Sequence, residues 1–336
     1  MRAETPMAFI RMMVLAYEDR GMRATTALAK AQITPVDLAK PQGRVTALQM
    51  EWFSEAAMRE LDDEALGWFS RRLPWGSYGL LVRACLTSPN LGLALARWCR
   101  HHGLLTQDVS LSVTQEGSVA WLGLQEHPER HDLGVYREFC TVSLLRNALG
   151  VACWLTDSRI PLKAVELAYA APAHHDSYAI LFEGPVQFEA AQSRMGFDAG
   201  YLQLPIRRDE QALQRMLKRA LVLTVRPYRR DRLLVDRVRE ALREQPELMR
   251  RADGLATQLN VSERTLHRQL REEGETLQAL KDRVRRDKAL VLLRTTSWPI
   301  ARIAAEVGMR HEKSFSRAFK HWTGQTPDEA RRHASP

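Results

Sequence analysis

One residue pattern occurs twice near the C-terminal end of the chain. The copies are residues 255–274 (LATQLNVSERTLHRQLREEG) and 303–324 (IAAEVGMRHEKSFSRAFKHWTG). Alanine, aliphatic, basic and apolar residues recur in the same order, with single-residue insertions at Arg310 and near Thr323. The matched pairs are Ala256 with Ala304, Leu259 with Val307, Leu266 with Phe315, Arg268 with Arg317, and Leu270 with Phe319. Two copies of the pattern imply two copies of one small structural unit.

The spacing inside each copy is typical of two short helices joined by a sharp turn. A small residue at Ala256 or Ala304 lets the first helix lie close against the second, and the matched apolar pairs then form a small core. The pattern therefore predicts two helix-turn-helix motifs, at about residues 250–274 and 298–324.

The turn between the helices also has a sequence signal. Asn260 and Gly308 occupy the turn positions, and both residue types tolerate a positive φ. Ser262 follows as the predicted N-cap of the second helix.

The second helix of each motif has one apolar face. Leu266 and Leu270 point inward at i and i+4, and Phe315 and Phe319 do so in the second copy. The opposite arc of each helix is polar and mostly basic, and we expect it to contact double-stranded DNA. Its residues are Arg264, His267, Arg268 and Arg271 in the first copy, and Glu312, Lys313, Ser316, Arg317 and Lys320 in the second.

Residues 276–293, between the two motifs, predict one continuous helix. Leu277, Leu280 and Val284, followed by Ala289 or Leu290, lie at helical spacing among basic residues. At 1.5 Å per residue the helix is about 27 Å long, and successive major-groove faces lie about 34 Å apart. A rigid helix of this length can hold both recognition helices on one side of the duplex.

Charge is distributed unevenly along the chain. Residues 206–336 contain 30 Lys and Arg against 18 Asp and Glu, a net charge of +12. Residues 1–205 contain 19 against 22, a net charge of −3. The basic charge thus coincides with the repeated motif, as phosphate binding requires. A solvated helix face explains any single arginine, but not the combination of repeat, spacing and charge.

Residues 229–332 resemble the DNA-binding domain of the AraC/XylS family of bacterial transcription regulators. The resemblance rests on SERTLHRQL, on the connecting helix ending in LL, and on IARIAAEVGMRHEKSFSRAFKHWTGQTP. Two positions depart from the family pattern, because Met309 replaces a common Phe and Ala330 replaces an aromatic residue. The base-reading positions that the resemblance implies are Arg264, His267 and Arg268 in the first motif, and Glu312, Lys313 and Arg317 in the second.

Residues 1–205 predict an α+β domain in which helices, a hairpin, a long helix and further strands follow one another. The expected helices are residues 7–20, 47–61, 90–102 and 133–155. The expected strands are residues 109–113 and 119–124, which form the hairpin, and residues 163–170, 178–182 and 201–205. The expected fold is an α+β N-terminal sensing domain and an all-α C-terminal domain with two helix-turn-helix motifs joined by a long helix.

Residues 181–206 are similar to the end of the arabinose-binding-like effector domain of one branch of the same family, and residues 76–92 add support. That resemblance implies binding of a small organic effector and self-association, and it implies no ligand residues. The expected division is a sensing and dimerisation domain at 1–205, a charged helical linker at 206–232 that is broken at Pro227, and a DNA-binding domain at 233–336. A sensing half that serves only as a dimerisation or protein-contact module is the alternative.

Other chemistry has little support in the sequence. The paired histidines lack the spacing of a metal site on one helix face, and a phosphate loop or nucleophile elbow is not found. We therefore expect neither an enzyme nor a cofactor or metal. A DNA-repair alkyl-transfer protein would need an activated cysteine, but the four cysteines have no close-pair spacing or activating motif. They are Cys85, Cys99, Cys140 and Cys153.

Six N-terminal tryptophans can either fill the core or line an apolar effector pocket, the core being more common. They are Trp52, Trp68, Trp75, Trp98, Trp121 and Trp154. An uninterrupted apolar run of about 18 residues is not present, and residues 1–13 do not resemble a signal peptide. We expect a cytoplasmic, nucleoid-associated activator without a membrane partner. Its expected partners are promoter DNA, RNA polymerase, a small-molecule effector and a second copy of the chain.

Overall fold

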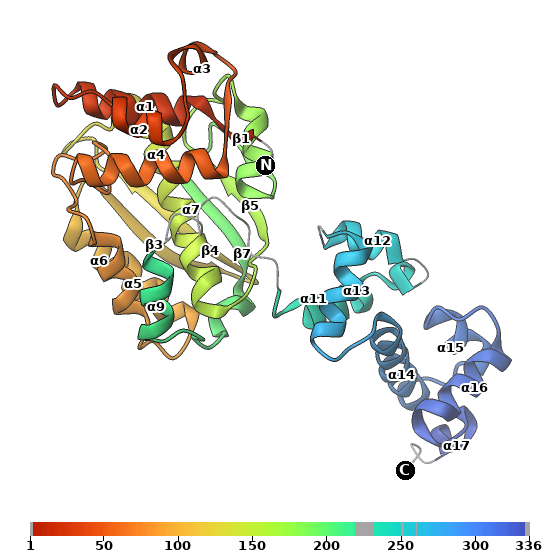
Figure 1. Ribbon diagram of the computed structural model, residues 1–336. Helices are drawn as coiled ribbons and strands as arrows, with labels where there is room; N and C mark the ends of the chain where they lie inside the picture. The colour runs from red at the N-terminus through yellow and green to blue at the C-terminus, as the bar shows by residue number, and fades with distance from the viewer. Residues whose placement is uncertain (1–2, 219–230, 250–251, 260, 333–336) are drawn as a thin grey trace. The chain divides into compact units, whose positions relative to one another are not determined.

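The computed structural model describes residues 3–218, 231–249, 252–259 and 261–332. The chain divides into two units, Met1–Arg230 and Asp231–Pro336, which are described separately below (Figure 1). The first unit combines a sheet with helices, and the second is helical. This is the expected α+β domain followed by an all-α domain.

A five-stranded sheet in the order β3-β4-β7-β5-β6 forms the framework of the N-terminal unit. Its strands are β3 (Val109–Glu116), β4 (Val119–Glu126), β7 (Ser193–Asp198), β5 (Leu162–Glu166) and β6 (Val186–Gln187). Neighbouring strands are antiparallel except β5 and β6. β3 and β4 form the predicted hairpin, whose turn places Gly117 at a φ of +58°, a conformation that favours glycine. A second, two-stranded sheet pairs β1 (Ala3–Pro6) with β2 (Arg44–Thr46).

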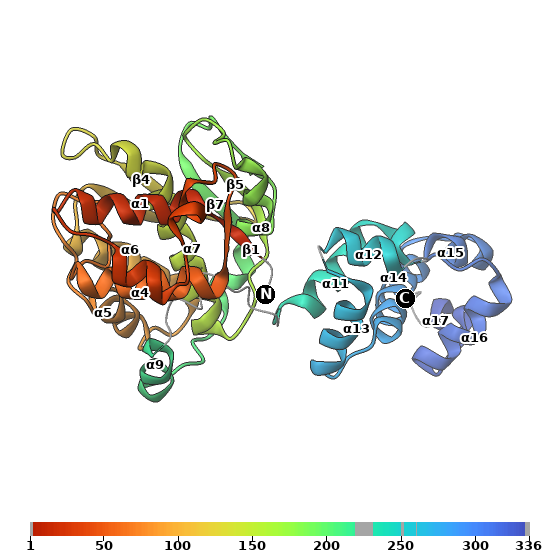
Figure 2. The ribbon, with the colours of Figure 1, turned by 45° about the horizontal axis from the view of Figure 1, so that its top comes forward.

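Of the four helices expected in residues 1–205, those now labelled α1, α4 and α6 begin within one residue of the predicted position, whereas α7 begins at Arg137 and not at residue 133. Thr46 and Gln49 form a capping box at the start of α4, and the Asn90 side chain accepts from the Leu93 N–H at 3.0 Å at the start of α6. α1 and α4 lie side by side in both views (Figures 1 and 2). The helices are α1 (Met7–Glu18), α2 (Thr25–Lys30), α3 (Pro35–Ala39), α4 (Ala47–Glu60), α5 (Ser77–Cys85), α6 (Leu91–Leu105), α7 (Arg137–Thr156), α8 (Tyr178–Phe182) and α9 (Glu210–Leu217).

α7 is the central helix of the unit. It follows a 3₁₀ turn, Gly134–Tyr136, and packs against β4, β7 and α6. By length and composition alone, Gly134–Thr156 is apolar enough to cross a membrane, which the sequence reading did not anticipate. However, 78% of the apolar stretch that meets this criterion is buried inside the unit. The helix is apolar because it lies in the core of the unit.

Two of the expected strands are wrong. Residues 178–182 form helix α8, in which Tyr178, Leu181 and Phe182 are buried at i, i+3 and i+4, the spacing of a helix face. Residues 201–205 fall largely in a 3₁₀ helix, Ala199–Gln203, because the Asp198 side chain caps this turn by accepting from the Gly200 N–H at 2.9 Å. The strand that enters the sheet instead is β7, which the sequence reading missed.

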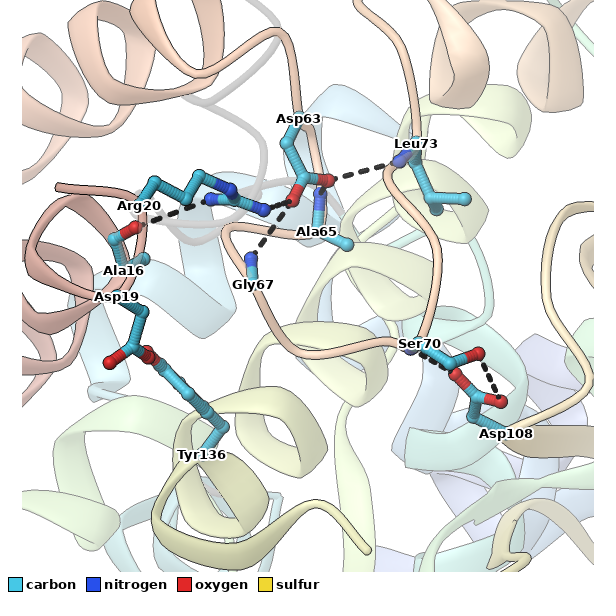
Figure 3. A network of polar contacts seen from close by, with 10 residues as sticks. All are labelled: Ala16, Asp19, Arg20, Asp63, Ala65, Gly67, Ser70, Leu73, Asp108 and Tyr136. Carbon is cyan, nitrogen blue, oxygen red and sulfur yellow. Dashed lines mark hydrogen bonds and ion pairs between the residues drawn. The ribbon is translucent and has the colours of Figure 1, made fainter. Parts of the chain in front are cut away.

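Two buried carboxylates hold the loop between α4 and α5 (Figure 3). Asp63 accepts from the N–H groups of Ala65, Gly67 and Leu73, each at 3.0 Å, and pairs with the Arg20 guanidinium at 2.6 Å. Asp108 accepts from the N–H of Ser70 at 2.6 Å and from its hydroxyl at 3.0 Å. A further bond, from the Tyr136 hydroxyl to Asp19 at 2.6 Å, ties α1 to the start of α7. An irregular segment is thereby fixed by side-chain acceptors in place of regular secondary structure.

The C-terminal unit contains two hydrophobic cores that share one helix. The first core is formed by α11 to α14, and the second by α14 to α17. α14 contributes Leu277, Leu280 and Val284 to the first core, and Ala289 and Leu293 to the second. The helices are α11 (Leu234–Glu244), α12 (Ala252–Gln258), α13 (Glu263–Glu272), α14 (Leu277–Thr295), α15 (Ile300–Glu306), α16 (Glu312–Thr323) and α17 (Pro327–Arg332), with a 3₁₀ helix at Pro246–Met249. The predicted connecting helix is confirmed.

Candidate DNA-binding surface and effector cavity

α13 presents one apolar and one basic face. Leu266 and Leu270 are fully buried, and the Ser262 hydroxyl accepts from the Thr265 N–H at 3.1 Å, so the predicted N-cap is confirmed. The side chains predicted to face DNA are all exposed, and Arg268 lies 3.6 Å from Glu272 one turn further on. They are Arg264, His267, Arg268 and Arg271.

α16 repeats this arrangement with larger apolar residues. Phe315 and Phe319 are fully buried with their ring centroids 5.6 Å apart. Ser316 is half-buried, whereas the other predicted positions are exposed. Arg317 donates from Nε to the Lys313 carbonyl at 3.4 Å. The exposed positions are Glu312, Lys313, Arg317 and Lys320.

The turn residue Gly308 and the two residues that depart from the family pattern, Met309 and Ala330, are compatible with the packing of the second core. Gly308 has a φ of +78°, as the sequence predicts, while its counterpart Asn260 lies outside the described residues. Met309 and Ala330 are partly buried against the core formed by α15 and α16. Both substitutions therefore keep an apolar side chain at the packing position.

A cavity of about 420 Å³ lies inside the N-terminal unit. Its walls come from α4, the loop between α4 and α5, α5, α7 and the C-terminal end of α9, together with single residues of β1, α1 and α8. The size is within the range of small-molecule sites. Because these segments are spread over residues 5–218, no local sequence pattern marks this cavity.

One face of α7 forms a wall of the cavity. The residues that line it lie three or four positions apart, the spacing of one helix face. Three of them, Ser143, Arg146 and Asn147, are polar, fall within about one helical turn and are half-buried; we call them the polar turn. The apolar members are Phe139, Val142, Leu144 and Val151.

Aromatic side chains also line the cavity. Three of the six N-terminal tryptophans line it, and together with Phe139 we call them the aromatic wall. The three are Trp52, Trp68 and Trp75. Trp98 is a core residue that is 2% exposed, while Trp121 and Trp154 lie beneath Arg194 and Arg208. Half of the six tryptophans thus line this cavity.

Several ionic groups of the cavity wall are engaged within the protein. Glu64 accepts from the N–H groups of Gly76 and Tyr78, each at 2.7 Å, and so caps the start of α5. Burial raises the pKa of Glu64 despite these bonds. Arg59 lies 4.3 Å over the Trp75 ring and 3.3 Å from Glu55.

α9 connects the cavity to the segment that leads toward the DNA-binding unit. Its end contributes Met216 and Leu217 to the cavity wall, followed by Lys218. Glu210 at its start pairs with Arg83 of α5 at 2.7 Å. α9 lies within the expected linker at 206–232, and it packs against the N-terminal unit. Residues 219–230, including Pro227, lie outside the described residues.

The cysteines have the properties of core residues. Burial raises the pKa of the Cys85 and Cys99 thiols to about 12 and raises that of Cys140 well above its usual range. A nucleophilic cysteine requires the opposite shift, because the thiolate is the reactive form. These three thiols therefore give no support to alkyl transfer. Within the described ranges, His, Cys, Asp and Glu do not form a group of three able to hold a metal ion.

The comparisons with known proteins match both units. The sequence profile described as "Arabinose-binding domain of AraC transcription regulator, N-term" matches residues 21–206, more than half of the chain. The chain belongs to the AraC family of transcription regulators. A "Helix-turn-helix domain" profile matches residues 255–333. The protein is a DNA-binding transcription regulator with an effector-binding N-terminal domain.

Relatives match this chain over nearly its full length. It is 27% identical to the "Ornithine utilization regulator" of Pseudomonas aeruginosa over 97% of this chain and 96% of that protein. Identity to an uncharacterized HTH-type transcriptional regulator of Mycobacterium tuberculosis is 26%, over 96% and 95% of the two chains. The solved structure of the transcriptional regulator CdpR from Pseudomonas aeruginosa is 22% identical over 94% of this chain and 98% of that chain. Its TM-score of 0.33 is too low to establish a shared arrangement.

Proposed function

We propose that α13 and α16 read base edges in two adjacent major-groove segments of one promoter site. The nine residues proposed to face DNA are Arg264, His267, Arg268, Arg271, Glu312, Lys313, Ser316, Arg317 and Lys320. The observation that carries this proposal is that both helices bury their apolar face and expose Arg268 and Arg317 at matched positions. Arginine can donate two hydrogen bonds to guanine O6 and N7, typically worth about 1–3 kcal/mol of discrimination.

Footprinting with the full-length protein tests this arrangement. Arg268→Ala and Arg317→Ala should each lose protection at a different sub-site, with the sub-sites about one helical turn apart. Arg243→Ala is the matched control, since Arg243 is an exposed arginine at the end of α11, outside both recognition helices. Loss of protection at the same bases in both variants would exclude two separate readers. Binding should also weaken steeply with salt, because phosphate contacts release counterions.

We further propose that the cavity of the N-terminal unit holds a small organic effector. Its volume of about 420 Å³, its aromatic wall and its polar turn support this assignment. L-Ornithine is the first compound to test, because a full-length relative is named for ornithine utilization. In a thermal-shift experiment an effector raises the melting temperature of the native protein. A protein that regulates normally without binding any tested compound would favour the contact-module alternative.

The remaining parts of the proposal concern regulation. The chain acts as an activator that contacts RNA polymerase, self-associates through its N-terminal domain, and works in the cytoplasm at the nucleoid. Its sensing domain is residues 1–205, its linker 206–232 and its DNA-binding domain 233–336; the division between Arg230 and Asp231 supports a DNA-binding domain that begins near residue 233. Transcription from the footprinted promoter with purified RNA polymerase tests activation, and sedimentation of the full-length protein tests for the homodimer.

A further inference from the structure

The C-terminal end of α9 is part of the cavity wall. Met216, Leu217 and Lys218 line the cavity from this end. Met216 and Leu217 are half-buried, so part of each apolar side chain is not covered by the protein. A molecule in the cavity would therefore lie against the last turn of α9. Because the chain continues from this turn into residue 219, the position of α9 also sets where the rest of the linker begins.

α9 is too short to be stable by itself. An isolated helix of eight residues does not persist in water, because few hydrogen bonds offset the entropy lost in forming its first turn. α9 therefore depends on its packing against α5, beside which it lies in both views (Figures 1 and 2). Of its eight residues, Leu213 is the one that is fully buried. The stability of α9 thus rests on a small number of side chains.

Two contacts join α9 to α5. Glu210 accepts three hydrogen bonds from the Arg83 guanidinium, the shortest of them 2.7 Å. Both side chains are exposed, so this ion pair is screened by water and salt. Near the other end of α9, Leu217 packs so closely on Gly79 that a Cβ at position 79 would lie 3.2 Å from its Cδ2. The lack of a side chain at Gly79 therefore makes room for Leu217.

The chain before α9 is held by bonds of a different kind. The Arg207 N–H donates to the Leu155 carbonyl at 2.7 Å. Arg208 donates from Nε to the Trp154 carbonyl at 2.8 Å. Both bonds join this segment to the C-terminal end of α7, the core helix. Since core elements open less readily than exposed ones, a release of α9 from α5 would pivot near Asp209 and displace its C-terminal end.

We propose that α9 is the element through which the cavity controls the DNA-binding unit. In the docked state Glu210 pairs with Arg83, and Leu217 lies on Gly79; in the released state both contacts are broken. An effector that lies against Met216 and Leu217 buries apolar surface only in the docked state, and so shifts the population toward it. For an activator, the docked state is then the one that binds promoter DNA. This inference rests on the proposed function, since it assumes that the cavity is the effector site.

Reversal of the ion-pair charges tests the docking in the full-length protein without any ligand. Arg83→Glu and Glu210→Arg each place like charges side by side, and each should speed amide hydrogen exchange of residues 211–218 about threefold or more, with exchange in α7 unchanged. The double variant restores opposite charges and should recover most of the protection. Arg100→Glu is the control, because Arg100 is an exposed arginine of α6 that does not line the cavity. Unchanged exchange in both single variants would overturn the proposal.

Promoter DNA should act on α9 in return, because coupling between two sites is reciprocal. Bound promoter DNA should slow the exchange of residues 211–218 about fivefold or more. A DNA fragment of equal length and scrambled sequence is the control, and it should leave the exchange unchanged. Exchange of α9 that is the same with and without bound promoter would overturn the proposal, since α9 would then only connect the two units.

L-Ornithine, used as the ligand probe, separates this inference from the proposed function. If L-ornithine raises the melting temperature, it should also slow the exchange of residues 211–218. A raised melting temperature with unchanged exchange would support an effector site and overturn control through α9. Slower exchange with promoter DNA, in a protein whose melting temperature no tested compound raises, would support the coupling through α9 and contradict the effector cavity.

Discussion

Asp63 is the residue whose replacement should most weaken the N-terminal unit. Its side chain is 2% exposed, and each carboxylate oxygen accepts two hydrogen bonds. Oδ1 accepts from Ala65 and Leu73, and Oδ2 accepts from Gly67 and Arg20. Asp63→Asn preserves the shape but turns one acceptor into a donor. Whichever oxygen is replaced, an N–H₂ group then faces two other donors.

The expected loss in the free energy of unfolding follows from these contacts. Two accepted hydrogen bonds are lost, each worth about 1.5–3 kcal/mol when the acceptor is charged. Removal of the negative charge also leaves the Arg20 guanidinium without its ion pair at 2.6 Å. The total expected loss is about 3–5 kcal/mol, the range found when one partner of a buried pair is removed. Arg20→Met should cost less, about 1–2 kcal/mol, because three backbone donors remain on Asp63.

Urea unfolding of the full-length protein, followed by tryptophan fluorescence, measures this difference. Six of the eight tryptophans precede residue 205, so the signal reports mainly on the N-terminal unit. Because the same loop carries Glu64, Leu66 and Trp68 of the cavity wall, Asp63→Asn should also weaken effector binding. An Asp63→Asn protein that is as stable as the wild type, or more stable than Arg20→Met, would refute this account of how the loop is held.

Three other predictions concern pH, capping and signal transfer. Burial lowers the pKa of His102 to about 4, below the unfolded value near 6.5, so stability should be lost as pH falls from about 6.5 to about 4, by about 3 kcal/mol in all. His102→Asn should flatten this dependence in urea titrations at pH 7 and 4.5. Ser262→Ala should destabilise the C-terminal unit by about 1 kcal/mol in thermal unfolding, and a neutral effect would contradict the N-cap role. Replacing residues 219–230 with a flexible linker of equal length should preserve effector binding, measured calorimetrically, but abolish the transcriptional response; a full response would argue against coupling through this segment.

The C-terminal unit could be predicted closely because its signals are local. Caps such as Ser262, a positive φ at Gly308 and i, i+4 apolar pairs each act within one or two turns of helix. The repeat then gave the i, i+4 apolar pairs twice, although α16 begins after His311 without a side-chain cap. Because the apolar faces of α13 and α16 could be predicted as buried, the opposite positions could be predicted as exposed. Ser316, which is half-buried, is the exception.

The N-terminal unit was harder because its strands and cavity depend on distant partners. β7 has no regular alternation: Gly196 lies beneath Trp121, and a Cβ there would be 2.8 Å from the indole ring. A glycine inside a strand reflects such a close approach of another group and weakens the strand signal. The five residues of α8 are too short for periodicity to distinguish helix from strand. The cavity draws on segments throughout residues 5–218, which only the tertiary fold brings together.

α14 has a consequence for how an operator can vary. Its first turns belong to one core and its last turns to the other. Its length therefore fixes the distance and the rotation between the two helix-turn-helix motifs. Inserting one residue between Val284 and Ala289 would advance the second motif by about 1.5 Å and rotate it by about 100° about the helix axis. Small changes in the spacing of the two sub-sites therefore cannot be matched by small changes in this helix.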